Sequence, residues 1–118
     1  MAIGFGGALP AQAKIYVTTG AGVAIDVVDL DGANTAVLIP TVAANTGPVT
    51  VGFDGYIYWA SYDTSVIGRA RIDGSDSQPG WFTGAAQPSG VAVSATHIYW
   101  SEDGNGRVSR AKLDGTDI

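Results

Sequence analysis

Apolar residues in this sequence come in short runs that alternate with turn-forming residues. Isoleucine, valine, tyrosine and tryptophan gather in runs of four to six positions, and glycine, aspartate, asparagine and proline bound these runs. No segment repeats apolar residues at helical spacing, whereas short apolar runs between turn residues are typical of β-strands. The pattern therefore predicts an all-β chain, with strands near residues 49–53, 56–61, 66–72, 80–83, 90–94, 97–102 and 107–113.

The same pattern occurs three times along the chain. The pair Ile-Tyr begins at residues 15, 57 and 98, and the pair Asp-Gly begins at residues 31, 73 and 114, so each Ile precedes its Asp by 16 residues. A period of about 20 to 50 residues indicates an array of one structural unit. We expect a single domain, residues 1–118, with repeat units at about 7–42, 48–84 and 88–118.

Each unit is predicted to fold as four antiparallel strands, that is, as one blade. The third strand of each unit places a small or β-branched residue and then a larger branched one on the same face, in the pairs Val28 and Leu30, Ala70 and Ile72, and Ala111 and Leu113. Such a face suits close packing of one sheet on the next. The following Asp-Gly pair supplies the residue with positive φ that a tight turn into the fourth strand needs.

The third unit carries a motif that points to a known repeat. It resembles the YWTD repeat, also called the low-density lipoprotein receptor class B repeat, at Pro88, Gly90, Tyr99, Trp100, Arg110, Ala111, Leu113, Asp114 and Gly115. The resemblance is strong over residues 48–117 and weak over residues 15–34. The Thr-Asp that follows Tyr-Trp in the family is replaced here by Ala60-Ser61 and by Ser101-Glu102. The resemblance implies a six-bladed β-propeller that binds proteins.

Three blades form half of such a ring and leave two apolar faces without neighbours. We therefore expect a homodimer, in which two chains with three four-stranded blades each close one six-bladed ring. The last unit stops after its Asp-Gly turn and so lacks a fourth strand. We expect a reciprocal exchange in which Ala2, Ile3, Gly4 and Phe5 pair with the partner's edge at Lys112, Leu113 and Asp114. The rival interpretations are a truncated chain and a larger array that does not close.

Composition excludes several classes of partner. The net charge is -5 and the six Lys and Arg residues are scattered, so the clustered positive charge that nucleic acid or anionic lipid requires is missing. No apolar run has the length of a membrane span. Cysteine is absent, and the N-terminal segment lacks the positive charge of a signal peptide. Location is left open, with a virion or extracellular site favoured over the cytoplasm.

One end of the predicted ring gathers the candidate ligand-binding residues. The hairpins between the second and third strands share this end, because alternate antiparallel connections do so. They contain Tyr62, Asp63, Glu102, Asp103, Asn105 and Arg107. Aromatic, acidic and amide groups together suit a sugar or a peptide, although the same residues also suit plain turns. Trp81 is a further candidate, because it and Phe82 are adjacent on an outer strand and cannot both face inward, which predicts one aromatic at the rim.

The sequence offers no set of residues for catalysis or for metal binding. His97 is the only histidine, and no loop has the alternating aspartates of a calcium site. Trp59 and Trp100 share one repeat position and are expected in the core, with their N–H groups bonded to the backbone. We therefore expect no catalytic residue, no metal and no cofactor.

The function expected from the sequence is a non-enzymatic binding or structural module that presents its ring-end loops to a protein partner. By association alone, a short chain that builds symmetric rings also suits a bacteriophage tail or decoration protein. The first alternative is a lectin, in which ring-end pockets hold a glycan. The second alternative is a propeller lyase or a lactonase-like hydrolase.

Overall fold

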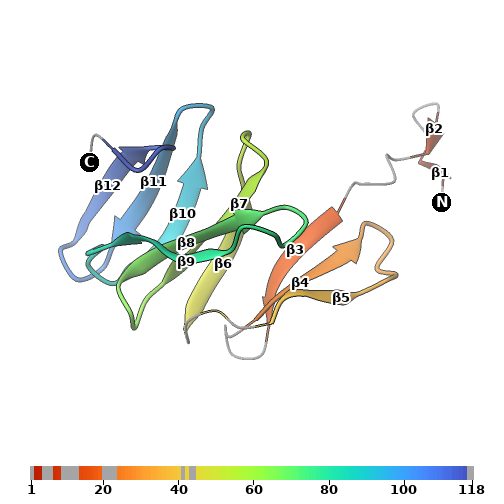
Figure 1. The fold of residues 1–118 in the computed structure, drawn as a ribbon, viewed down its shortest axis with the longest axis horizontal. Coiled ribbons are helices and arrows are strands. Elements are labelled where there is room, and N and C mark those ends of the chain that lie inside the picture. The colour runs from red at the N-terminus through yellow and green to blue at the C-terminus, as the bar shows by residue number, and fades with distance from the viewer. Residues whose placement is uncertain are drawn as a thin grey trace.

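The computed structural model describes residues 2–3, 7–8, 14–19, 24–40, 42 and 45–116, and every regular element within them is a β-strand (Figure 1). The strands form three antiparallel sheets and a separate two-stranded ribbon. The predicted all-β class is thereby confirmed. None of the described residues is helical, so none of them belongs to a helix that could cross a membrane.

The second and third sheets are built from strands that follow one another in the chain. The second sheet contains β6 (Thr46–Val51), β7 (Tyr56–Ser61), β8 (Val66–Arg71) and β9 (Gln78–Thr83). The third sheet contains β10 (Pro88–Val93), β11 (His97–Glu102) and β12 (Arg107–Lys112). Their registers are equivalent, because Ile57 lies opposite Ala70 and Ile98 lies opposite Ala111. The strands expected from the pattern are therefore confirmed, with β6, β9 and β10 beginning two or three residues earlier.

Within the described part of residues 7–42, the first sheet has three strands, whereas four were expected of this unit. These are β3 (Lys14–Thr19), β4 (Ala24–Asp29) and β5 (Ala36–Ile39). No innermost strand of this sheet occurs among the described residues, and β2 (Gly7–Ala8) pairs with β1 (Ala2–Ile3) in a ribbon apart from the sheets (Figure 1). Residues 9–13, which connect this ribbon to β3, lie outside the described residues.

The Asp-Gly turn has the same geometry in all three sheets. The glycine of each turn has a φ of +86°, at Gly32, Gly74 and Gly115. In each turn the aspartate Oδ1 accepts a hydrogen bond of 2.9 Å from the backbone N–H two residues further on, in the pairs Ala33 to Asp31, Ser75 to Asp73 and Thr116 to Asp114. The positive φ predicted for these glycines is confirmed, and the repeated dipeptide has a local structural cause.

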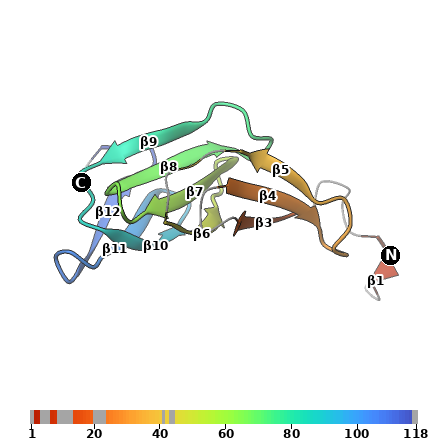
Figure 2. The ribbon, with the colours of Figure 1, turned by 90° about the horizontal axis from the view of Figure 1, so that it is seen from below.

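The sheets stack face to face over two apolar cores. Ile25 and Ile39 of the first sheet pack with Ile57, Trp59 and Ala70 of the second sheet. The opposite face of the second sheet packs on the third sheet through Tyr58, Ala60, Ile67, Ile98, Trp100 and Ala111. Figure 2 shows the first two sheets side by side with their strands in the same order, β5–β4–β3 and β9–β8–β7–β6. The predicted contact is confirmed for Ala70 and Ala111, whereas Leu30 and Ile72, which were expected on the same packed face, lie beyond the ends of β4 and β8 and are each 43% exposed.

Two sheet faces have no neighbour among the residues that the structure describes. Ile67 and Val108 occupy the same repeat position, but Ile67 is fully buried whereas 72% of Val108 is exposed. Likewise, Ile57 and Ile98 are fully buried, and their counterpart Ile15 is 41% exposed. The open face of the first sheet is therefore the face that carries Ile15, and the open face of the third sheet is the face that carries Val108.

Candidate functional site

The hairpins β7–β8 and β11–β12 lie at the same end of the sheets, along the lower edge in Figure 1. Both are tied to the residue that precedes the first strand of their own sheet. The Tyr62 N–H donates to the Asn45 carbonyl and the Asp103 N–H donates to the Gln87 carbonyl, each over 3.2 Å. Asn45 and Gln87 have φ values of +58° and +51°. The left-handed conformation at equivalent positions aims both carbonyls at the hairpins.

A pocket of about 280 Å³ lies at this end, where the second and third sheets meet. It is lined by Asn45, Gly47, Tyr62, Pro88 and Ser89. Asn45 Nδ2 donates to Asp63 Oδ1 over 3.2 Å, and Ser89 Oγ donates to Asp103 Oδ1 over 3.1 Å. Of the candidates from the sequence, the structure thus brings Tyr62 to the wall of the pocket, and the exposed Asp63 and Asp103 each accept a hydrogen bond from one of its lining residues.

Glu102, Asn105 and Arg107 form a separate cluster at the β11–β12 hairpin, in which Glu102 is buried and the other two residues are exposed. Glu102 is only 4% exposed, and its carboxylate accepts hydrogen bonds from Asn105 Nδ2 at 2.9 Å and from Arg107 Nε at 3.1 Å. The bond from Asn105 is the largest of the causes that lower the pKa of Glu102 to about 2. The expectation that Glu102 faces a ligand is not met, because the residue anchors the hairpin from within.

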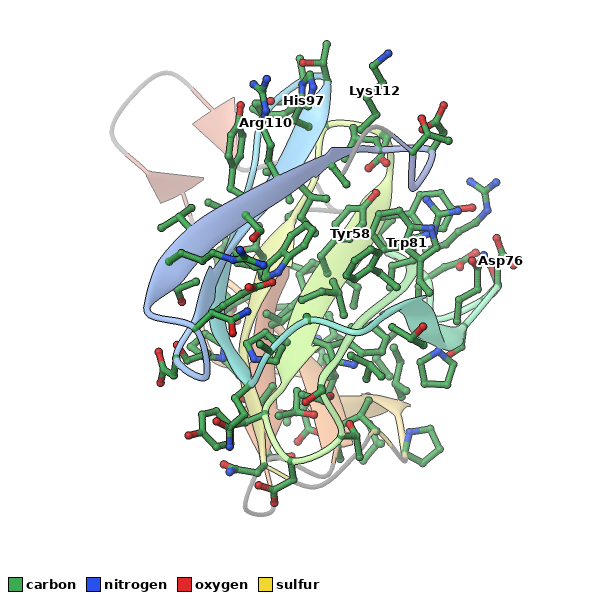
Figure 3. All side chains as sticks on the ribbon, turned by 90° about the vertical axis from the view of Figure 1, so that its left-hand side faces the viewer. Tyr58, Asp76, Trp81, His97, Arg110 and Lys112 are labelled. Atoms are coloured by element: carbon green, nitrogen blue, oxygen red, sulfur yellow. The ribbon has the colours of Figure 1, made fainter. Side chains whose placement is uncertain are left out.

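Trp81 does not reach the rim as expected. Its ring meets Tyr58 edge-on at 5.6 Å and lies 4.9 Å from the Arg69 guanidinium (Figure 3). Phe82 also faces the third sheet, with its ring 4.9 Å from that of Trp100. The β8–β9 register shifts between Ile67 and Arg69, and such an irregularity breaks the alternation of faces along a strand. Two adjacent aromatics can therefore both face the same neighbour.

The two core tryptophans differ from the expectation in their hydrogen bonds. Trp100 Nε1 donates to Glu102 Oε1 over 2.9 Å, and so it binds a side chain and not the backbone. Trp59 Nε1 is buried and has no partner among the described residues. The reason lies two positions further on, where the second sheet has the shorter Ser61 in place of Glu102. Burial of both rings in the core is confirmed.

Three of the residues expected to close a dimer lie at the opposite end of the third sheet. Lys112, Leu113 and Asp114 line a second pocket, of about 430 Å³, together with Ala95, Thr96 and His97. No strand pairs with the outer edge of β12 among the described residues. Ala2 and Ile3 pair within their own chain, and Gly4 and Phe5 lie outside the described residues. The strand exchange between chains therefore stays a prediction.

Four of the five residues that line the pocket between the second and third sheets, here called the loop-end pocket, were missed from the sequence, namely Asn45, Gly47, Pro88 and Ser89. Asn45 and Gln87 precede the first strand of consecutive units, and this equivalence was the available signal. No cluster of three or more metal-ligating side chains occurs within the described part of the chain. Thr96 Oγ1 lies 2.8 Å from His97 Nδ1, at the end away from the loop-end pocket.

No model of a known protein family and no curated protein matches this sequence. Among solved structures, a chain of the nidogen/laminin complex matches with a TM-score of 0.76 at 20% identity, over 91% of this chain and 43% of that chain. Virginiamycin B lyase from Staphylococcus aureus matches with a TM-score of 0.55 at 17% identity, over 90% of this chain and 40% of that chain. This chain thus spans less than half the length of either protein. Both are β-propellers, and with its three stacked antiparallel sheets this chain has the β-propeller fold.

Proposed function

We propose that this chain is a non-enzymatic β-propeller module that binds a protein partner at its loop end. The observation that carries the proposal is the pocket of about 280 Å³ between the second and third sheets. Its wall combines the Tyr62 ring, the Asn45 amide and the Ser89 hydroxyl. A largely preformed pocket with a few fixed polar groups suits one or two side chains of an extended peptide. The nidogen chain was solved in complex with laminin, which is a protein partner.

A binding role is favoured over catalysis by the side chains around the pocket. Asp63 and Asp103 are each held by a neutral neighbour, and the single histidine lies at the other end of the sheets. A nucleophile, a base and a group that orients the base would have to meet within hydrogen-bond reach for covalent catalysis. The described residues bring no such set together. We therefore infer that the similarity to virginiamycin B lyase is a similarity of fold and not of activity.

We further propose that two chains complete one six-bladed ring of YWTD-like blades. The support is the pair of open faces, which is what remains when half of a ring is separated from the rest. Glu102 supports the YWTD resemblance, because it occupies the position of the Asp in that motif and takes a hydrogen bond from the Trp of the same strand. The first residues of each chain are proposed to supply the strand that the edge of β12 lacks. Association with a virion has no support in the fold or in the comparisons.

A lectin is the alternative that the same pocket favours, since an aromatic ring beside amide and hydroxyl groups also suits a sugar. Display of a random peptide library against the intact protein separates the two. We expect enriched peptides whose binding is lost in Tyr62→Ala and in Ser89→Arg, which fills the pocket, and is kept in Phe53→Ala at an exposed hairpin. Binders on a glycan array that respond to the same variants, without any enriched peptide, would replace the proposal by the lectin.

A further inference from the structure

Neighbouring sheets share a repeated hydrogen bond to the backbone. The Tyr16 hydroxyl, in the first sheet, donates to the Ile72 carbonyl of the second sheet over 3.2 Å. Arg69 Nη1, in the second sheet, donates to the Leu113 carbonyl of the third sheet, also over 3.2 Å. Ile72 and Leu113 are equivalent residues, each directly before an Asp-Gly pair. Each sheet therefore holds the turn of the next sheet through this carbonyl.

The equivalent turn of the first sheet is not held in this way. Its carbonyl belongs to Leu30, and no donor among the described residues reaches it. A Cβ atom built on Gly74 would lie 3.0 Å from the Leu38 carbonyl oxygen, and one built on Gly115 would lie 3.6 Å from the Trp81 ring. Nothing lies within 4 Å of the same position on Gly32. The first turn thus has the same backbone conformation as the other two turns, but no neighbouring sheet contacts it among the described residues.

The third sheet carries matching donors on its open face. Tyr99 is the counterpart of Tyr16, and Arg110 is the counterpart of Arg69, because Tyr99 lies opposite Arg110 as Tyr58 lies opposite Arg69. Arg110 is exposed, and Figure 3 shows it at one end of this sheet, near His97 and Lys112. Both kinds of donor that hold a turn inside the chain are therefore present where no turn is held.

The two open faces carry charges of opposite sign, and the third sheet's face also carries an exposed apolar residue. On the first sheet, Asp26 lies opposite Val17 in the middle of the open face, and its buried Oδ1 has no partner among the described residues. On the third sheet, the open face carries the cations Arg110 and Lys112 beside the exposed Val108. Inside the chain, Val108's counterparts Ile25 and Ile67 are fully buried against the next sheet.

We propose that the open face of the third sheet binds the open face of the first sheet of a second copy of this chain. Tyr99 and Arg110 then supply the donors for the Leu30 carbonyl, and Val108 packs against Ile15 and Val17. This inference rests on the two-chain ring proposed above. It specifies which residues form each of the two contacts between the chains, which are here called seams. It commits to a contact between two different faces, so that a residue of one face never meets its own copy.

Cross-linking between two single-cysteine variants tests this contact, because the chain has no cysteine of its own. Val17→Cys and Val108→Cys are purified separately, mixed, and treated with a short bismaleimide. We expect cross-linked dimers in the mixture and none with either variant alone, since the two copies of Val108 lie in different seams. Phe53→Cys mixed with Val108→Cys is the matched control, because Phe53 is exposed but lies on a hairpin outside both open faces.

Sedimentation equilibrium measures the strength of the same contact. Val108→Glu would bury an unpaired charge in the seam, and we expect self-association to weaken by about a hundredfold, with the circular dichroism of the chain unchanged. Arg110→Glu should weaken it by about tenfold or more, whereas Arg110→Lys, which keeps a donor, should weaken it less. Phe53→Glu should associate as the unaltered protein does.

Three results would overturn the seam: cross-links between two copies of Val108, none in the mixture, or undiminished association of Val108→Glu. These results are separable from failure of the proposed function. Peptide binding that depends on Tyr62 would survive a wrong seam, because both sheets that line the pocket belong to one chain. Conversely, the cross-linking pattern would survive a display experiment that enriches nothing.

Discussion

Trp59 and Trp100 occupy the same position in consecutive sheets, yet only Trp100 donates its indole N–H to another side chain, the carboxylate of Glu102. Both rings are almost completely buried. A buried donor without a partner costs about 1–3 kcal/mol, and a hydrogen bond to a charged group contributes about 1.5–3 kcal/mol. The second sheet thus contains a buried indole N–H without a hydrogen-bond partner among the described residues, whereas the equivalent N–H of the third sheet is bonded to Glu102.

Replacing each tryptophan by phenylalanine should show this difference. Trp59→Phe removes an unpartnered donor, so the free energy of unfolding should change little beyond the lost ring volume. Trp100→Phe loses the same volume and also the bond to Glu102, and it should cost about 1.5–3 kcal/mol more than Trp59→Phe. Urea unfolding of the two variants provides the comparison, and equal losses would contradict the prediction.

Glu102 should make the protein sensitive to acid over a defined range. Its pKa in the folded state is lowered to about 2 from an ordinary value of 4.5. The stability it contributes is therefore complete above the unfolded pKa and is lost as the pH falls from about 4.5 towards 2, by roughly 3 kcal/mol in all. Glu102→Gln should flatten the pH dependence of unfolding in this range.

The titration can also be followed directly, because Glu102 is the only glutamate in the chain. Carbon-13 labelling of glutamate gives a single side-chain carboxyl resonance in the folded protein. We expect its midpoint well below 4.5, and Asn105→Ala should raise that midpoint, because the Asn105 amide is the largest cause of the lowered pKa. A midpoint near 4.5 would show that the network does not hold the charge.

Gly68 is required by the ring of Trp59. A Cβ atom at position 68 would lie 2.4 Å from Trp59 Cε2 and Nε1, and a rigid indole cannot move aside as the end of a flexible side chain would. Gly68→Ala should cost about 1–3 kcal/mol of unfolding free energy. Gly80→Ala is the control, since nothing lies within 4 Å of that position. In a double-mutant cycle with Trp59→Phe, part of the cost should be recovered.

Substitution of Gly74 and of Gly32 distinguishes the energetic cost of backbone strain from the cost of a steric clash with the preceding sheet. Both have a φ of +86°, but only Gly74 has the Leu38 carbonyl oxygen within 3.0 Å of the added Cβ. In the dissociated chain, Gly32→Ala should therefore cost about 1 kcal/mol, and Gly74→Ala should cost more. At concentrations where chains associate, the cost at Gly32 should grow, which a concentration series of thermal unfolding would detect.

The repeat and its strands could be predicted because they depend on local chemistry. Asp-Gly fixes a turn through one side-chain hydrogen bond and one positive φ. The packing of Ala70 and Ala111 followed from alternation along β8 and β12. These features need only residues that are close in the sequence, which is why the core positions of Trp59, Trp100, Ala70 and Ala111 agreed with expectation.

The remaining features depend on residues that meet only in the folded chain. The register shift between β8 and β9 directs Trp81 towards the third sheet. No short sequence motif predicts where the pairing of two strands shifts. The sequence predicts Glu102 as a ligand-binding candidate because acidic, aromatic and amide groups together suit a sugar or a peptide, yet donors from Trp100, Asn105 and Arg107 stabilise its burial. Ser89 lines the pocket only because the second and third sheets stack on each other, and the sequence alone does not show this contact.

The second sheet is the only described sheet with four strands and with a neighbour on each face. Its amide protons should therefore exchange with solvent most slowly, because opening its ladder also disrupts two apolar cores. Amides of β3 and β12, which form sheet edges, should exchange faster in dilute solution and slow down as chains associate. The middle third of the sequence would then act as the unit on which the outer two fold, so that the last stage of folding is an encounter between molecules.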